Sequence, residues 1–156
     1  MTATADLYDE RGDELQSLAI QLGSFGGEAR FEGEIRTVRC FEDNGLVKQI
    51  LTEPGAGAGK VLVIDGGSSL RSALMGDLIG AAAVENGWNG VVIFGAVRDR
   101  VALSLLPLGI RALGSNPRKS TKTGSGELDA VLTVGSVIFR PGVGIWCDED
   151  GILVER

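Results

Sequence analysis

The segment Met75–Asp99, MGDLIGAAAVENGWNGVVIFGAVRD, contains the pattern that decides the fold. Its first half has an acidic residue near the start, good helix formers inside and Asn86-Gly87 at the end, which together predict a helix. Its second half contains VVIFGAV, an unalternated apolar run typical of a strand that is covered on both faces. A similar run, KVLVIDGG at Lys60–Gly67, precedes the helix. Strand, helix and strand at this spacing predict a βαβ unit with parallel strands.

The flanking segments predict a layered, mixed α/β domain around this unit, with the single domain spanning residues 1–156. After residue 126 the sequence alternates short apolar runs with Gly, Pro-Gly and Asp-Gly turns, which indicates antiparallel hairpins. The other expected elements are a helix over 4–19, a strand around 35–40, a short helix capped by Asn44, a short helix over 101–106, and a third strand, GIRALG, at 109–114.

Composition excludes several classes of function. The chain has 156 residues, a net charge of −6 and no histidine. The charge gives no reason to expect direct nucleic-acid binding, and the missing histidine removes Ser-His-Asp catalysis and His-ligated zinc. Cys40 and Cys147 form no CxxC motif, so two free, buried thiols are expected, with one disulfide left open. There is neither a signal peptide nor an apolar run long enough for a membrane helix, which favours a cytoplasmic protein.

Asp77 and the pair Arg98-Asp99 are expected to meet although twenty residues separate Asp77 from Arg98. In a βαβ unit the helix begins at the sheet edge where both strands end. Asp77 lies at the start of the helix, and Arg98-Asp99 follows the second strand. This edge is the usual ligand crevice of α/β sheets.

The residue types at this edge indicate a specific chemistry. Two carboxylates without histidine or thiolate make an oxygen-only site that suits Mg²⁺ or Mn²⁺. The backbone N–H groups of the helix N-terminus, Gly76-Asp77-Leu78-Ile79, can hold a carboxylate. Arg98 can bind the same small anion or stabilise an enolate oxygen. These features together predict a site for a 2-keto acid. The structural alternatives are that Asp77 caps its helix, and that Arg98-Asp99 is a surface ion pair or caps the next helix.

Five stretches, FGGEARFEGEIRTVRCFEDNGLVKQIL, KVLVIDGGSSLRSALMGDLI, NGWNGVVIFGAVRD, LGIRALGSNPRKSTKTG and DEDGILV, resemble the RraA family from about Thr4 to the C-terminus. That family includes the regulator of ribonuclease E activity A and the RraA-like 4-hydroxy-4-methyl-2-oxoglutarate aldolases. The resemblance implies a three-layer ββα swivelling domain assembled as a homotrimer or a stacked hexamer. It also implies a class II, metal-dependent aldolase and oxaloacetate decarboxylase, with a ribonuclease E-type partner and a non-catalytic regulatory role as the alternative.

The same resemblance assigns roles to the predicted site residues. Asp99 would bind the divalent ion directly, and Asp77 would support it through water. Arg98 and the turn Gly76-Asp77-Leu78-Ile79 would hold the pyruvoyl part of the substrate. Some ribonuclease-regulating members of the family lack the aspartate after the arginine and are inactive as lyases, whereas this sequence keeps it.

Other motifs give weaker signals. PGAGAGKV, at residues 54–61, is not a P-loop because Pro54 replaces the first glycine and a strand follows instead of a helix. DGGSS, at 65–69, supplies no complete glycine fingerprint for a methyltransferase cofactor. NPRKSTKTGSGE, at 116–127, is either a solvated loop or a loop that binds an anion or a partner. Asp148–Asp150 favours a hairpin turn over a calcium loop. A Schiff-base aldolase would need a buried lysine, and Asp65–Arg100 contains none.

Overall fold

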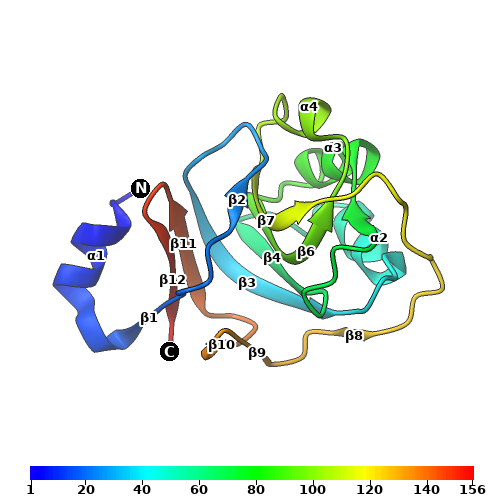
Figure 1. Ribbon diagram of the computed structural model, residues 1–156. Helices are drawn as coiled ribbons and strands as arrows, with labels where there is room; N and C mark the ends of the chain where they lie inside the picture. Colours follow the sequence, from blue (N-terminus) through cyan, green and yellow to red (C-terminus); the bar gives the residue numbers. More distant parts are fainter.

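The computed structural model describes all 156 residues and confirms the βαβ unit (Figure 1). Strands β4 (Lys60–Asp65) and β6 (Gly90–Val97) are hydrogen-bonded neighbours and run parallel. Helix α3 (Asp77–Glu85) connects them and ends at Asn86-Gly87, where Gly87 has a φ of 88°. Every residue of β6 is buried, as its unalternated apolar sequence predicts.

One ten-stranded sheet runs through the fold, and a small hairpin packs beside it. The strand order is β1-β12-β11-β3-β4-β6-β7-β2, with β5 on β6 and β8 on β3, while β9 and β10 pair separately. Strands β3, β4, β6 and β7 are parallel to one another, and β11 and β12 form an antiparallel hairpin. The remaining bounds are α1 Thr4–Arg11, η1 Gly12–Glu14, β1 Leu15–Ser17, β2 Gly23–Ser24, β3 Phe31–Arg39, α2 Gly45–Thr52, β5 Ala73–Met75, α4 Arg100–Leu103, β7 Gly109–Ser115, β8 Glu127–Leu128, β9 Leu132–Val134, β10 Val137–Phe139, β11 Gly144–Asp148 and β12 Gly151–Glu155.

Two hydrophobic cores lie on opposite faces of the parallel strands. Side chains alternate between faces along a strand, so Leu62 and Ile64 of β4 join the core beneath α2 and α3. Val61 and Val63 join the second core, which β9 to β12 cover from the other side. Helices, parallel strands and antiparallel strands therefore form three layers, and the mixed α/β class with its ββα layering is confirmed.

The predicted helix over 4–19 is wrong beyond Arg11. Helix α1 ends at Gly12, whose φ is 49°, and Leu15–Ser17 then pairs with β12 as an antiparallel strand. The hydrogen bonds offered by β12, which lies near the C-terminus, outweigh the local helix propensity of this segment. Thr4 is buried and binds Asp148 through its N–H and its hydroxyl, both at 2.7 Å, rather than capping α1 with its side chain.

Several smaller expectations are confirmed. Cys40 and Cys147 are free and buried, and burial raises the pKa of the Cys40 thiol to about 12. Residues 54–59 form turns before β4, and Asp148–Gly151 closes the hairpin between β11 and β12. The short helix predicted over 101–106 begins one residue earlier and ends at Leu103. None of the helices is long and apolar enough to cross a membrane.

Candidate functional site

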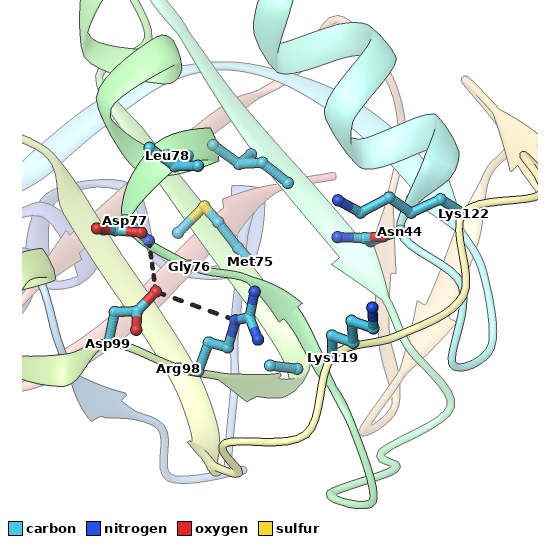
Figure 2. Close-up of a pocket in the computed structure, with 11 residues that line it drawn as sticks. Asn44, Met75, Gly76, Asp77, Leu78, Arg98, Asp99, Lys119 and Lys122 are labelled. Atoms are coloured by element: carbon cyan, nitrogen blue, oxygen red, sulfur yellow. Dashed lines mark hydrogen bonds and ion pairs between the residues drawn. The ribbon is translucent and has the colours of Figure 1, made fainter.

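The structure brings Asp77, Arg98 and Asp99 together at the carboxyl edge of the parallel strands (Figure 2). Asp77 is the first residue of α3, and Arg98-Asp99 directly follows β6. The Asp99 Oδ2 atom accepts a hydrogen bond of 3.0 Å from the Asp77 backbone N–H. The Arg98 Nε atom lies 4.0 Å from the same carboxylate oxygen. The three residues therefore converge as the βαβ spacing predicts.

Asp99 binds a helix other than the one that follows it. It has a left-handed backbone, with φ 61° and ψ 46°, and stands at the N-cap position of α4 without capping that helix through its side chain. Its carboxylate instead accepts from the N-terminus of α3. The side chain of Asp77 makes no hydrogen bond within the chain and caps no helix. Neither residue thus has the simple capping role that was the structural alternative, although Arg98 and Asp99 do form a partly exposed ion pair.

The predicted backbone cradle is only partly free. The first hydrogen bond within α3 runs from the Gly80 N–H to the Gly76 carbonyl, at 2.9 Å. The N–H groups of Leu78 and Ile79 precede that bond and have no partner in the helix. The Asp77 N–H, which was expected to be free for an anion, is already bound to Asp99. Gly76, Leu78 and Ile79 therefore offer N–H groups that no other group of the chain uses, and only the N–H of Asp77 is taken.

Gly76 allows the close approach of Asp99 and Arg98 to the start of α3. A Cβ atom at Gly76 would lie 2.5 Å from Asp99 Oδ2, 3.2 Å from Arg98 Cγ and 3.3 Å from Arg98 Nε. Real Cβ atoms do not come this close to an oxygen, so any side chain here would displace the carboxylate.

We expect Gly76→Ala to destabilise the fold by about 1–3 kcal/mol, because the added methyl group must push Asp99 away from the Asp77 N–H. Urea unfolding measures this change. Gly114→Ala is a matched control, since a Cβ atom there would meet nothing closer than Leu70 at 3.5 Å. An unfolding free energy equal to that of the wild type would mean that Asp99 moves without cost and that its position is not fixed by Gly76.

These residues line a cavity of about 60 Å³ that extends from the start of α3 to α2 and the loop after β7. An open groove of about 720 Å³ adjoins the cavity and shares Asp77, Arg98 and Asp99 with it. The cavity is lined by Asn44, Ala73, Met75, Gly76, Asp77, Leu78, Ile79, Arg98, Asp99, Lys119 and Lys122.

Asp43 fixes the wall of the cavity opposite Asp77. It is 3% exposed, and its carboxylate accepts from Thr123, from the Thr121 hydroxyl at 2.9 Å and from the backbone N–H groups of Gly45 and Gly124 at 3.0 and 3.1 Å. Burial alone would raise the pKa of Asp43, but these hydrogen bonds outweigh it and hold the pKa below its usual value. Asp43 thereby joins the N-terminus of α2 to the loop that carries Lys122.

Three residues of this wall were not predicted from the sequence as members of the site. Asn44 was assigned as a cap of α2, yet at the N-cap position its side chain makes no capping hydrogen bond. Lys119 and Lys122 belong to the loop at 116–127, for which an anion-binding role was one of two interpretations. Both lysines are exposed, so neither is the buried lysine of a Schiff-base aldolase. Only the concentration of basic residues in this loop gave a signal.

The site has the donors for one small divalent cation. Asp77 has an unpartnered carboxylate, and Asp99 uses only one of its two oxygens within the chain. The chain brings no three His, Cys, Asp or Glu side chains together as a complete ligand set. One or two carboxylates with retained waters are the ligands that Mg²⁺ usually takes from a protein. The residues present therefore fit such an ion.

A family model described as RraA-like, Aldolase/RraA, matches residues 4–154. A protein of Laribacter hongkongensis (strain HLHK9) is 55% identical over 150 residues, which are 96% of this chain and 93% of that protein. It is named "Putative 4-hydroxy-4-methyl-2-oxoglutarate aldolase".

Two solved structures are similar over nearly the whole chain. The RNA-processing inhibitor RraA from Thermus thermophilis is 48% identical, with a TM-score of 0.95, and the match covers 99% of this chain and 93% of that one. A protein of Geobacillus kaustophilus HTA426, described as an S-adenosylmethionine: 2-dimethylmenaquinone methyltransferase, is 43% identical, with a TM-score of 0.95 and coverage of 99% and 94%. The glycine-rich turn Gly66–Ser69, which lacks the complete fingerprint for a methyltransferase cofactor, does not line the cavity that holds Asp77 and Asp99. Sequence, fold and these matches agree that the chain belongs to the RraA-like family.

Proposed function

We propose that this protein is a divalent-metal-dependent, class II carbon–carbon lyase. Its substrates would be 2-keto acids of the 4-hydroxy-4-methyl-2-oxoglutarate type, cleaved to pyruvate, and oxaloacetate, which it would decarboxylate. The convergence of Asp77, Arg98 and Asp99 on one cavity carries the proposal. The name of the Laribacter hongkongensis relative supports the aldolase class.

Asp99 and Asp77 would hold Mg²⁺ or Mn²⁺ at this site. The ion supplies Lewis-acid chemistry, because its charge polarises the keto group and stabilises negative charge on that oxygen. Asp99 is suited to direct binding because the Asp77 N–H fixes its carboxylate and leaves one oxygen free. The Asp77 carboxylate has no partner in the chain, so it can orient bound water toward the same ion.

Arg98 and the start of α3 would hold the reacting end of the substrate. The N–H groups of Leu78 and Ile79 lie at the N-terminus of α3, which is the positive end of the helix dipole. They can bind the carboxylate next to the keto group. Arg98 is part-buried and has the Pro117 carbonyl, at 3.5 Å, as its only hydrogen-bond acceptor. Apart from its 4.0 Å ion pair with Asp99, its guanidinium can stabilise the pyruvate enolate that remains after the carbon–carbon bond breaks.

Chelation is expected to abolish pyruvate formation and added metal to restore it. The chelator-treated protein is assayed with 4-hydroxy-4-methyl-2-oxoglutarate and with oxaloacetate, before and after addition of Mg²⁺ or Mn²⁺. Full activity in the presence of chelator would eliminate the metal-dependent mechanism. A protein that forms no pyruvate from either substrate with either metal would eliminate the lyase function.

We further propose that the protein assembles as a homotrimer, or as a stacked hexamer. Leu78, Val101 and Leu105 are each 81% exposed, and the last two line the groove that borders Arg98-Asp99. Large apolar side chains this exposed beside a groove favour contact with a second copy of the chain. Sedimentation equilibrium is expected to give a trimer or hexamer at micromolar concentration. A stable monomer would contradict this assembly.

A second candidate function is regulation of a ribonuclease E-type enzyme by direct protein contact. The 48% identity to an RNA-processing inhibitor favours it. A net charge of −6 suits docking onto a basic, RNA-binding segment of such a nuclease. Binding of the purified protein to a ribonuclease E at physiological salt tests this function, and the absence of a complex would remove it. Both functions can coexist in one protein, so the chelation experiment tests the lyase and the binding experiment tests the regulator.

A further inference from the structure

Asn44 is a buried polar side chain without a partner. It is 6% exposed, and its amide makes no hydrogen bond with any other group of the chain, although its Oδ1 atom is fully buried. Figure 2 shows its amide nitrogen pointing into the cavity, between the lysines and Met75. The buried Oδ1 acceptor without a donor costs about 1–3 kcal/mol. The Nδ2 group, which faces the cavity and has no acceptor in the chain, is the part of the amide that can donate to a bound ligand.

The backbone around Asn44 explains why the side chain stays in this unfavourable place. The Asn44 N–H donates to the Thr121 carbonyl at 2.9 Å, and the Asn44 carbonyl accepts from the Lys48 N–H at 2.9 Å. The preceding Asp43 is held by the hydrogen bonds from Thr121, Thr123, Gly45 and Gly124 described above. The backbone of Asn44 is therefore fixed at the edge of the cavity, and its side chain starts from a set position beside whatever the cavity binds.

Lys119 and Lys122 lie on the same side of the cavity as Asn44. Figure 2 shows the two ammonium groups on either side of its amide, across the cavity from Asp77 and Asp99. Neither lysine has a carboxylate within ion-pair distance, whereas Lys60 pairs with Glu34 at 3.2 Å. Two unpaired ammonium groups beside the Nδ2 donor of Asn44 make this end of the cavity attractive to an anion, whereas the buried Asn44 Oδ1 atom is an acceptor and takes no part in binding it.

The loop that carries these lysines is fixed to the sheet. The buried hydroxyl of Ser120, between Lys119 and Thr121, donates to the Ala73 carbonyl at 2.8 Å and lies 2.8 Å from the Ser72 hydroxyl. Thr121 and Thr123, on either side of Lys122, both bind Asp43. Each lysine is thus next to an anchored residue, so its backbone position relative to Asn44 is set by buried hydrogen bonds.

We propose that Asn44, Lys119 and Lys122 form a second anion subsite, which binds the distal carboxylate of a 2-keto dicarboxylate. This inference rests on the proposed function, which places the keto acid end of the substrate at Arg98 and Asp99. One cavity then holds both ends of the molecule: carboxylates and a guanidinium at the reacting end, an amide and two ammonium groups at the far end. The subsite selects dicarboxylic substrates over monocarboxylic keto acids of the same length.

Two unreactive ligands that differ only at the far end test the subsite. 2-Oxoglutarate ends in a carboxylate, and 2-oxopentanoate has a methyl group in its place. Binding is measured by calorimetry in the presence of Mg²⁺, with the wild type, Asn44→Ala, the double variant Lys119→Ala/Lys122→Ala, and Lys48→Ala. Lys48 is the matched control, because it is exposed, unpaired and close to the site in α2, but does not line the cavity.

We expect the wild type to bind 2-oxoglutarate at least about tenfold more tightly than 2-oxopentanoate. The distal carboxylate can form charge-assisted hydrogen bonds with the subsite, whereas the methyl group cannot. The double variant should lose about tenfold in affinity for 2-oxoglutarate and change less than about twofold for 2-oxopentanoate. Asn44→Ala should act in the same direction, and Lys48→Ala should bind both ligands as the wild type does.

Four results would overturn the subsite. Equal affinity of the wild type for both ligands, or equal losses for both in the double variant, would show that the far end is not recognised. Inorganic phosphate that matches 2-oxoglutarate in affinity and is lost in the double variant would assign the lysines to phosphate instead. A wild type that binds neither keto acid would remove the proposed function and the subsite together, whereas the other three results leave the proposed function standing.

Discussion

Asp99→Asn is expected to weaken Mn²⁺ binding by about a hundredfold, the loss that follows when a carboxylate at a metal site is neutralised. Asparagine keeps a side-chain oxygen that can accept the hydrogen bond from the Asp77 N–H, which is 3.0 Å long with Asp99 as the acceptor. It also tolerates the left-handed backbone at this position, where φ is 61°. The free energy of unfolding should therefore change by less than about 0.5 kcal/mol. Calorimetric titration with Mn²⁺, alongside urea unfolding, measures both quantities.

Two further variants separate the roles of Asp99. Asp99→Ala also loses the hydrogen bond to α3 and the tolerance for a left-handed backbone, so it should be less stable by about 1–2 kcal/mol. Asp150→Asn removes the same charge from the exposed turn between β11 and β12, far from the cavity lining, and should bind Mn²⁺ as the wild type does. Equal Mn²⁺ affinity in the wild type and Asp99→Asn would mean that Asp99 serves only to hold the start of α3.

Asp43→Ala is expected to cause the largest loss of stability, about 3–5 kcal/mol, because it removes the buried carboxylate that accepts five hydrogen bonds. The donors of these bonds come from Thr121, Thr123, Gly45 and Gly124. For a chain of this length the loss corresponds to a decrease in Tm of roughly 10 °C. Glu127→Ala is the matched control, since Glu127 is 63% exposed and pairs only with Arg39, so its loss should cost less than about 1 kcal/mol.

The contribution of Asp43 should depend on pH. Its hydrogen bonds lower the pKa of the carboxyl in the folded protein, so the stabilisation is complete above the pKa of an unfolded aspartate, about 3.9, and is lost as pH falls below it. The difference in unfolding free energy between the wild type and Asp43→Ala should thus be constant above about pH 5 and shrink toward pH 3. A difference that stays constant down to pH 3 would mean that the charge of Asp43 contributes nothing to stability.

The sequence by itself was sufficient to predict the convergence of Asp77, Arg98 and Asp99. The buried strands β4 and β6 are encoded by apolar runs, and α3 is bounded by Gly76 and by Asn86-Gly87. Once strand, helix and strand are known, the parallel connection leaves only one edge of the sheet where these residues can lie. The antiparallel hairpins near the C-terminus were predictable for a similar reason, because their turns are marked by local glycines.

Other features were decided only by contacts between distant segments. Residues 15–17 form a strand rather than the end of a helix because β12 offers backbone hydrogen bonds from the other end of the chain. The sequence suggested, as structural alternatives, that Asp77 caps its own helix and that Arg98-Asp99 caps the next one. In the structure the Asp77 N–H instead donates a hydrogen bond to Asp99.

The far wall of the cavity is the clearest case. Asn44 and Lys122 are neighbours only because Asp43 collects hydrogen bonds from residues about eighty positions away in the chain. Local propensities and spacing encode an element and its edges, so the βαβ unit and its three site residues could be predicted from the sequence. Local propensities and spacing carry no information on which loop the buried carboxylate of Asp43 will bind. Asn44, Lys119 and Lys122 were therefore joined to the site by the tertiary structure alone.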